Sequence, residues 1–141
     1  MNVLNFLDAN VWLALIWNRH VHSERARQWF QAASEEEFLF CRFTQMTVLR
    51  LLTTEAVMGN DVQTMFAAWE LWDSIWSDER IAFVAEPETF EREFRARTRG
   101  AGKSPKVWAD AYLLSFAALL KLNLVTFDRA LQQRGVEVLV L

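Results

Sequence analysis

Val3-Leu4-Asn5-Phe6-Leu7-Asp8 is a short, mostly apolar run that ends in an aspartate, and Leu124-Val125-Thr126-Phe127-Asp128 repeats the pattern near the other end of the chain. Short apolar runs predict strands that are buried on both faces of a sheet. A carboxylate beside such a strand loses hydration, which is costly unless a partner compensates its charge. Each aspartate also precedes a predicted helix, so each taken alone could be a helix N-cap.

Asp110 cannot be explained as a cap, because it lies inside a predicted helix. It is the only charged residue between Val107 and Leu120. Taken alone, it could be a buried carboxylate paired with an arginine or a hydroxyl. Hard divalent cations prefer carboxylate oxygens, so the three aspartates together predict a metal-binding pocket made by distant parts of the chain.

Strand and helix patterns alternate along the 141 residues, which suit one domain with a substantial core. Strands are expected at residues 3–7, 38–41, 81–84, 124–127 and 136–141. Helices are expected at 10–18, 22–33, 44–57, 62–77, 88–97, 105–122 and 129–134, with Thr44 and Ser104 as N-caps. This order predicts an α/β fold, a single domain at 1–141 with a mostly parallel central sheet flanked by helices. Strand ends that share an edge would bring Asp8 and Asp128 together, with Asp110 near them.

A basic cluster lies just before the helix that carries Asp110. Arg95, Arg97, Arg99, Lys103 and Lys106 have no acid among them, although the chain as a whole has a net charge of -3. A local basic patch on an acidic protein indicates nucleic-acid contact more specifically than a basic total. The alternative is an ordinary solvated surface.

Cysteine content and hydropathy predict a cytoplasmic protein. Cys41 is the only cysteine, so no intramolecular disulfide can form, which suits a reducing compartment. The first residues have no basic start before the apolar run, so no signal peptide is expected. The apolar stretch 105–120 carries Asp110 and is short for a bilayer span, so it is expected to be a core helix.

Four segments resemble the motifs of the PIN domain family, and their order and spacing resemble those of VapC-type toxins from bacterial toxin–antitoxin pairs. They are Phe6-Leu7-Asp8-Ala9-Asn10-Val11-Trp12-Leu13-Ala14-Leu15, Thr44-Gln45-Met46-Thr47-Val48-Leu49-Arg50-Leu51-Leu52-Thr53, Trp108-Ala109-Asp110-Ala111-Tyr112-Leu113 and Leu124-Val125-Thr126-Phe127-Asp128. The resemblance covers nearly the whole chain.

The resemblance implies a Mg²⁺- or Mn²⁺-dependent endoribonuclease, with Asp8, Asp110 and Asp128 as the acidic metal-binding and catalytic positions. It also implies an RNA substrate, a small cognate antitoxin and a homodimer. On this basis Arg97, Arg99, Lys103 and Lys106 are expected to contact the RNA backbone.

Gln45 departs from the family pattern, because the second motif commonly carries a glutamate there. An amide oxygen can accept a hydrogen bond from a metal-bound water but supplies no charge. One well-bound metal is therefore expected, with Gln45 as a neutral member of the catalytic set. The competing interpretation of Gln45 is a surface residue at the start of a helix.

Other functions remain open from the sequence. Gln45 favours a PIN-like module that binds RNA or a partner without cutting. Asp8-Ala9-Asn10-Val11 loosely resembles a haloacid-dehalogenase nucleophile motif, but that family expects a second aspartate where Asn10 stands, so a phosphatase ranks last. The stripe of Trp69, Trp72 and Trp76 is expected to be mainly core, with part of it facing a partner.

Overall fold

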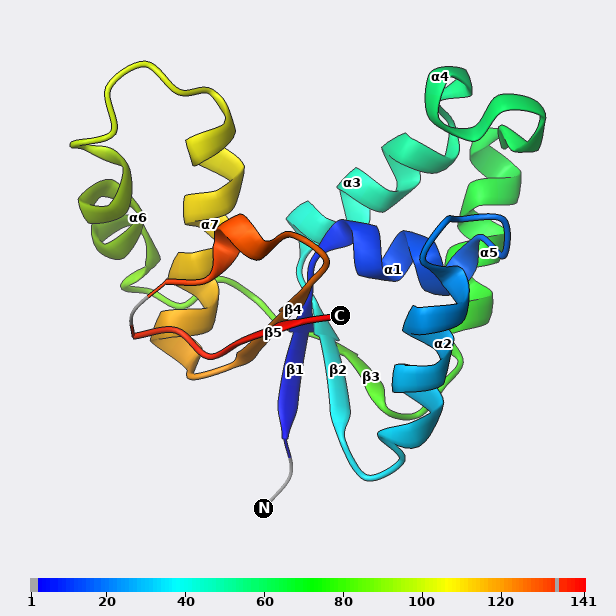
Figure 1. The fold of residues 1–141 in the computed structure, drawn as a ribbon, viewed down its shortest axis with the longest axis horizontal. Helices are drawn as coiled ribbons and strands as arrows, with labels where there is room; N and C mark the ends of the chain where they lie inside the picture. The colour runs from blue at the N-terminus through cyan, green and yellow to red at the C-terminus, as the bar shows by residue number, and fades with distance from the viewer. Residues whose placement is uncertain (1–2, 134) are drawn as a thin grey trace.

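The sheet that organises the molecule is parallel throughout. In the computed structural model, which describes residues 3–133 and 135–141, five strands pair in the order β3-β2-β1-β4-β5 (Figure 1). All neighbouring pairs run parallel. The strands are β1 (Leu4–Leu7), β2 (Glu37–Phe40), β3 (Ile81–Phe83), β4 (Asn123–Thr126) and β5 (Val138–Val140). The prediction of a single α/β domain with a mostly parallel central sheet is therefore confirmed.

Helices cover both faces of this sheet. They are α1 (Ala9–Ile16), α2 (Ser23–Ala32), α3 (Arg42–Leu52), α4 (Glu55–Met58), α5 (Met65–Trp76), α6 (Phe90–Thr98) and α7 (Lys106–Leu120). Figure 1 shows α6 and α7 on one side of the sheet and α1, α2, α3 and α5 on the other. Because both faces are covered, the three central strands are buried along nearly their whole length.

Alternate residues of each strand supply the two halves of the core. Leu7 and Val125 belong to the cluster under α1, α3 and α5, whereas Phe6 and Leu124 belong to the cluster under α7. Successive side chains of a strand point to opposite faces, so one short strand fills both clusters. The largest fully buried aromatic side chains are Trp12, Trp72, Phe6, Phe38, Phe40 and Phe116.

The tryptophan stripe of α5 is divided between the core and the surface. Trp72 is completely buried and its ring lies 5.8 Å from that of Trp12. Trp69 and Trp76 keep 48% and 43% of their surface exposed. The expectation that the stripe is mainly core therefore holds for Trp72 and is wrong for Trp69 and Trp76, which face outward.

The helix after β2 begins three residues earlier than predicted. Cys41 is its N-cap, and Thr44 is the third helical residue rather than the cap. The Thr44 hydroxyl accepts from the Cys41 backbone N–H at 3.1 Å and donates to the Cys41 carbonyl at 3.0 Å. The first of these bonds belongs to a capping box, in which the side chain of the third helical residue satisfies the backbone N–H of the cap. The helix ends at Leu52, and the residues up to Asp61 form α4 and a 3-10 turn, η1 (Gly59–Asp61).

The apolar helix that carries Asp110 is a core helix, as predicted. α7 has 15 residues and begins at Lys106, one residue later than the predicted first position at Pro105. Within the described part of the chain, no helix combines the length and the apolar character needed to cross a bilayer.

The chain after β4 is less helical than predicted. η2 (Arg129–Leu131) is a single 3-10 turn in place of the helix expected at 129–134, whose last residue lies outside the described part of the chain. Asp128 caps this turn, and Leu131 is buried.

Candidate active site

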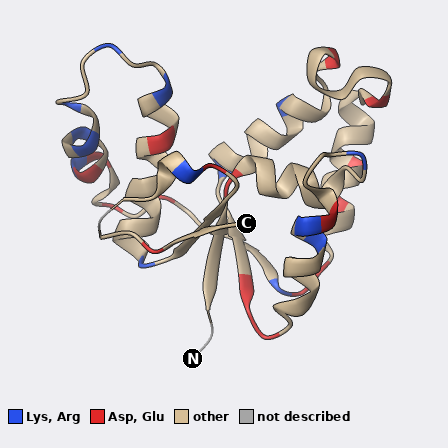
Figure 2. Cartoon of the chain, in the orientation of Figure 1, with Lys and Arg blue, Asp and Glu red and all other residues tan. Residues whose placement is uncertain are grey.

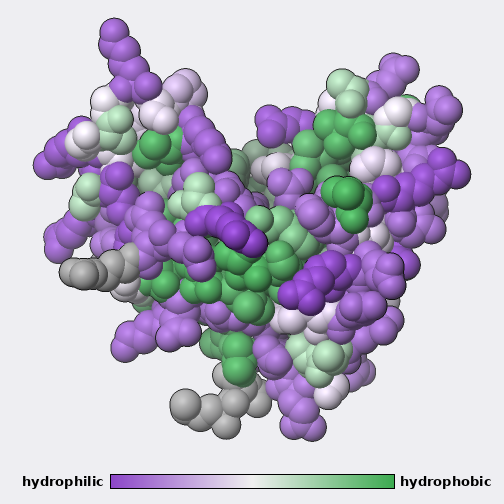
Figure 3. Space-filling model, viewed as in Figure 1, coloured by the Kyte–Doolittle hydropathy of each residue, from purple (hydrophilic) through white to green (hydrophobic). Residues whose placement is uncertain are grey.

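Asp8 and Asp128 follow two neighbouring strands at the same edge of the sheet. β1 and β4 pair directly, and the Asp8 backbone N–H donates to the Val125 carbonyl at 2.9 Å. Figure 3 shows a notch in the surface between the α6–α7 lobe and the lobe of α3, α4 and α5, and Figure 1 places the carboxyl ends of β1 and β4 below it. This is the edge at which open parallel sheets bind ligands.

The two aspartates differ in whether they cap a helix. Asp128 does cap: its side chain accepts from the Ala130 backbone N–H at 2.9 Å. Asp8 precedes α1, yet its side chain makes no capping hydrogen bond. Its carboxylate accepts from the Thr126 hydroxyl at 2.9 Å instead. Asp8 is therefore held by the neighbouring strand.

Thr126 connects the two acidic positions. Its side chain is completely buried, and its oxygen also accepts from the Asp128 backbone N–H at 3.0 Å. A β-branched residue in a strand is ordinarily explained by its fit to the sheet alone. The bond to Asp8 gives Thr126 a further role, because it orients a candidate catalytic carboxylate.

Asp110 lies in the second turn of α7 and is half-buried. Burial raises its pKa; the positive charge of Lys106 opposes this rise and the negative charge of Asp128 adds to it. Burial also raises the pKa of Asp8, against the hydrogen bonds from Thr126 and the Ala9 backbone, and the charges of Asp110 and Asp128 raise it further. The three carboxylates thus lie within electrostatic reach of one another.

Lys106 is the cation of this group. Its ammonium lies 3.1 Å from Asp128 Oδ2. The hydrogen bond with Asp128 raises the pKa of Lys106, and the charges of Asp110 and Asp8 add to the rise. The pKa of Asp128 is lowered, first by the Ala130 backbone N–H and then by Lys106. A residue predicted to contact RNA is therefore paired with an acid of the site.

Gln45 is buried, so its interpretation as a surface residue is wrong. It is 2% exposed and is the fourth residue of α3. Its amide oxygen accepts a hydrogen bond from Arg42 Nη1, and the Arg42 guanidinium lies 5.0 Å from the centre of the Phe83 ring. Arg42 lies outside the helix predicted at 44–57, so its spacing of three residues from Gln45 on one helix becomes visible only in the structure. Among the described residues, no hydrogen bond links Gln45 to the three aspartates.

The donor chemistry of the site fits a hard divalent cation. In the described part of the chain, neither Asp8 nor Asp110 has an ion pair, and Lys106 balances only one of the three negative charges. Carboxylate oxygens are the ligands that Mg²⁺ and Mn²⁺ prefer. As they stand, however, no three acidic, histidine or cysteine side chains among the described residues are close enough together to hold an ion. Shared metal coordination by Asp8, Asp110 and Asp128 therefore stays a prediction.

The basic cluster is partly neutralised by two acids on α6, the helix that carries its first two arginines. Arg97 pairs with Glu93 and Arg95 pairs with Glu91, each at 3.0 Å and one helical turn apart. Figure 2 shows basic residues over α6, the loop after it and the start of α7. Of the four residues predicted to bind RNA, Arg99 and Lys103 are exposed and make no ion pair among the described residues.

Comparison with known proteins identifies the family. The PIN domain family model matches residues 6–137. Ribonuclease VapC41 of Mycobacterium tuberculosis is 39% identical over 133 residues, which cover 91% of each chain. Ribonuclease VapC39 of the same organism is 28% identical over 132 residues, covering 89% of this chain and 88% of that one. The chain therefore belongs to the PIN domain family, among its VapC-type ribonucleases.

Solved structures share the same fold. VapC20 of Mycobacterium tuberculosis, a toxin that cleaves the sarcin-ricin loop, matches with a TM-score of 0.68 at 12% identity, covering 94% of this chain and 95% of that one. VapBC2 from Rickettsia felis, solved with a DNA fragment from its promoter, matches with a TM-score of 0.72 at 10% identity, covering 98% of both chains. At these identities the likeness establishes the fold alone.

Proposed function

We propose that this protein is a divalent-metal-dependent endoribonuclease and the toxin of a toxin–antitoxin pair, with residues 1–141 as one catalytic domain. Asp8 is the observation that carries the proposal. Its carboxylate lies at the end of the central strand, is held by Thr126 and lacks an ion pair in the described structure. It also lies within electrostatic reach of Asp110 and Asp128. The family supports the proposal, since VapC41 and VapC39 are ribonucleases by name.

Asp8, Asp110 and Asp128 would hold Mg²⁺ or Mn²⁺. When bound, such an ion lowers the pKa of a coordinated water and offsets the charge that builds up on the phosphodiester oxygens. Thr126 fixes the orientation of the Asp8 carboxylate and of the Asp128 backbone. Lys106, which pairs with Asp128 in the structure, is placed to turn to a substrate phosphate once another cation neutralises that carboxylate.

Gln45 leaves the site short of one negative charge. Its amide oxygen bonds to Arg42, a cation, so this position adds no attraction for a second metal ion. We therefore propose one tightly held metal ion.

The first test is cleavage of RNA by Asp8→Asn and Asp110→Asn in the presence of Mg²⁺ or Mn²⁺. Both changes remove one charge with little change of shape, and we expect both to abolish cleavage while the fold persists. Asp73→Asn is the matched control, because Asp73 lies on the exposed side of α5. Circular dichroism would check folding. Cleavage that survives both site changes in nuclease-free preparations would overturn the proposal, as would full activity in EDTA.

The basic cluster, and above all Arg99 and Lys103 in the loop between α6 and α7, is proposed to carry the affinity for the RNA backbone. The net charge of the chain is -3, so its general field repels RNA and binding needs a local cluster. Arg99→Ala combined with Lys103→Ala should weaken binding to every RNA sequence. Each lost phosphate contact should also flatten the dependence of affinity on salt by about 0.7 in the log–log slope. An unchanged slope would make the loop an ordinary solvated surface.

The second candidate function is a PIN-like module that binds RNA or a partner without cutting. The pairing of Gln45 with Arg42 favours it, because a cation lies next to the position where the family commonly has an acid. The two functions differ in one assay. RNA binding that persists with no cleavage at any Mg²⁺ or Mn²⁺ concentration would support the module and reject the enzyme.

A small antitoxin and a second copy of the chain are the proposed protein partners. Figure 3 shows apolar residues at the surface of the lobe formed by α3, α4 and α5. Met65, Phe66 and Trp69 of α5 are 73%, 74% and 48% exposed, which is unusual for side chains so large and apolar. Light scattering would measure the oligomeric state. Co-purification with the product of an adjacent small reading frame would test the antitoxin. The cytoplasm is the proposed compartment, because RNA and both protein partners meet there.

A further inference from the structure

Trp108 is a large aromatic side chain that the proposed active site does not use. It is the third residue of α7 and is 61% exposed. Its ring centre lies 5.9 Å from that of Phe94 on α6, at an angle of 47°. Phe94 therefore supports the indole on one side, and most of the ring still faces solvent.

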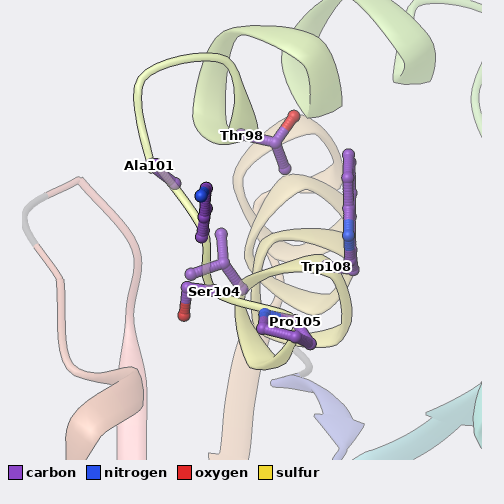
Figure 4. Close-up of a pocket in the computed structure, with 8 residues that line it drawn as sticks. Thr98, Ala101, Ser104, Pro105 and Trp108 are labelled. Atoms are coloured by element: carbon purple, nitrogen blue, oxygen red, sulfur yellow. The ribbon is translucent and has the colours of Figure 1, made fainter.

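Two of the hollows on the described surface share Trp108 as a wall. The first has about 240 Å³ and is lined by the loop from Ala101 to Pro105 together with Thr98 and Val107. Figure 4 shows the indole edge-on along one side of it, with Ala101 and Ser104 across from the ring. The second has about 410 Å³ and is lined by Glu91, Phe94, Arg95, Thr98 and Arg99. A flat ring that separates two open hollows can receive another flat ring on its face.

The charges around Trp108 favour an anionic ligand. Lys103 lines the first hollow, and Arg95 and Arg99 line the second. Glu91 is the acid lining them, and it already pairs with Arg95. A flat aromatic group next to unbalanced cations is the combination that single-stranded nucleic acids recognise, because each nucleotide offers a base to stack and a phosphate to neutralise.

The position of Trp108 relates this surface to the active site. Trp108 and Asp110 are two residues apart on one helix, so they project from nearly opposite sides of α7. Asp110 faces the acidic group, and Trp108 faces α6. Trp108 and Asp110 therefore lie on different sides of the first two turns of α7.

We propose that Trp108 stacks a base of single-stranded RNA on the outer side of α7, while Arg99 and Lys103 bind the adjoining phosphates. The stacked base belongs to a nucleotide other than those joined by the bond that is cut. Because a base must be unpaired to stack on Trp108, the site selects RNA that is single-stranded beside the cleavage position. The inference rests on the proposed ribonuclease function, because it assumes that RNA occupies the notch.

The test compares two fluorescein-labelled single strands of equal length, one a uridine-rich RNA and the other carrying abasic ribose at consecutive positions. Affinities are measured in EDTA, so that the strands stay intact. Trp108→Ala should weaken binding of the base-bearing RNA roughly tenfold and leave the abasic strand unchanged, since stacking of one base contributes at about this level. Trp108→Tyr should restore most of the affinity. Arg99→Ala with Lys103→Ala should weaken both strands.

Trp76→Ala is the matched control, because Trp76 is another exposed tryptophan with one close aromatic neighbour, Phe40 at 5.0 Å. It should bind both strands like the parent. The inference is overturned if Trp108→Ala binds the base-bearing RNA as the parent does, or if it weakens both strands equally. Loss of a co-purified protein partner in Trp108→Ala with unchanged RNA affinity would assign the surface to protein and also overturn it. A parent protein that binds neither strand would instead reject the proposed function.

Discussion

Thr126→Val is the most informative single change in the acidic group. Valine keeps the β-branched shape that the strand needs but removes the hydroxyl. That hydroxyl donates to Asp8 Oδ2 at 2.9 Å and accepts from the Asp128 backbone N–H at 3.0 Å. Both bonds vanish at once, so the change separates the positioning role of Thr126 from its role in the sheet.

The expected loss of stability follows from the two bonds. A hydrogen bond to an ionised group contributes about 2 kcal/mol, and a backbone N–H left without a partner costs about 1 kcal/mol. The added methyl group gains back roughly 0.8 kcal/mol, because the side chain is fully buried. The free energy of unfolding should therefore fall by about 2 kcal/mol at neutral pH.

The pH dependence distinguishes this mechanism from simple repacking. Thr126 stabilises the ionised form of Asp8, so its loss raises the pKa of Asp8 above the value that burial has already raised. When the pH falls below the pKa of Asp8 in the folded protein, the carboxyl is neutral and its bond to Thr126 contributes only about 1 kcal/mol. The stability difference from the parent should narrow accordingly.

Urea unfolding in EDTA between neutral and acid pH measures this difference directly. Thr126→Ser is the matched control, because it keeps the hydroxyl and loses only a methyl group, so its cost should not depend on pH. Calorimetry should also show weaker Mn²⁺ binding by Thr126→Val than by Thr126→Ser. The reasoning would be refuted if the difference in free energy of unfolding between Thr126→Val and the parent were as independent of pH as that of Thr126→Ser.

Three further predictions concern charges in and beside the site. The pKa of Asp8 is higher in the folded protein than in the unfolded chain. The free energy of folding is therefore most favourable below the pKa of Asp8 in the unfolded chain, and this advantage is lost as the pH rises through the pKa in the folded protein. Asp8→Asn should thus be more stable than the parent at neutral pH in EDTA and equally stable in acid. Gln45→Glu should change the Mn²⁺ affinity measured by calorimetry little, because Arg42 would neutralise the new charge. The same change combined with Arg42→Gln should tighten Mn²⁺ binding. Tighter binding by Gln45→Glu alone would show that Arg42 does not compensate the charge. Lys106→Gln should tighten Mn²⁺ binding in the absence of RNA by freeing its partner carboxylate, whereas Lys103→Gln should not, and equal effects would point to a general charge effect.

The sequence by itself determined the architecture and the acidic positions. Short apolar runs alternating with helical patterns specify a parallel sheet, because strands buried on both faces must be apolar along their length. Asp8 and Asp128 each end such a run, and strand direction alone places them at one edge. Asp110 is identifiable from the sequence because it is the only charged residue in an otherwise mostly apolar helix.

Tertiary structure alone decided the partners of these groups. The Thr126 bond to Asp8 joins residues 118 positions apart, and the Lys106 bond to Asp128 joins residues 22 apart, so no local pattern contains either. Strand periodicity assigns Thr126 to a buried face but does not say which side chain lies opposite its hydroxyl. The direction in which Trp108 points is likewise set by the packing of α7 against α6. Local pattern fixes which elements form, whereas the identity of each partner depends on how distant elements pack.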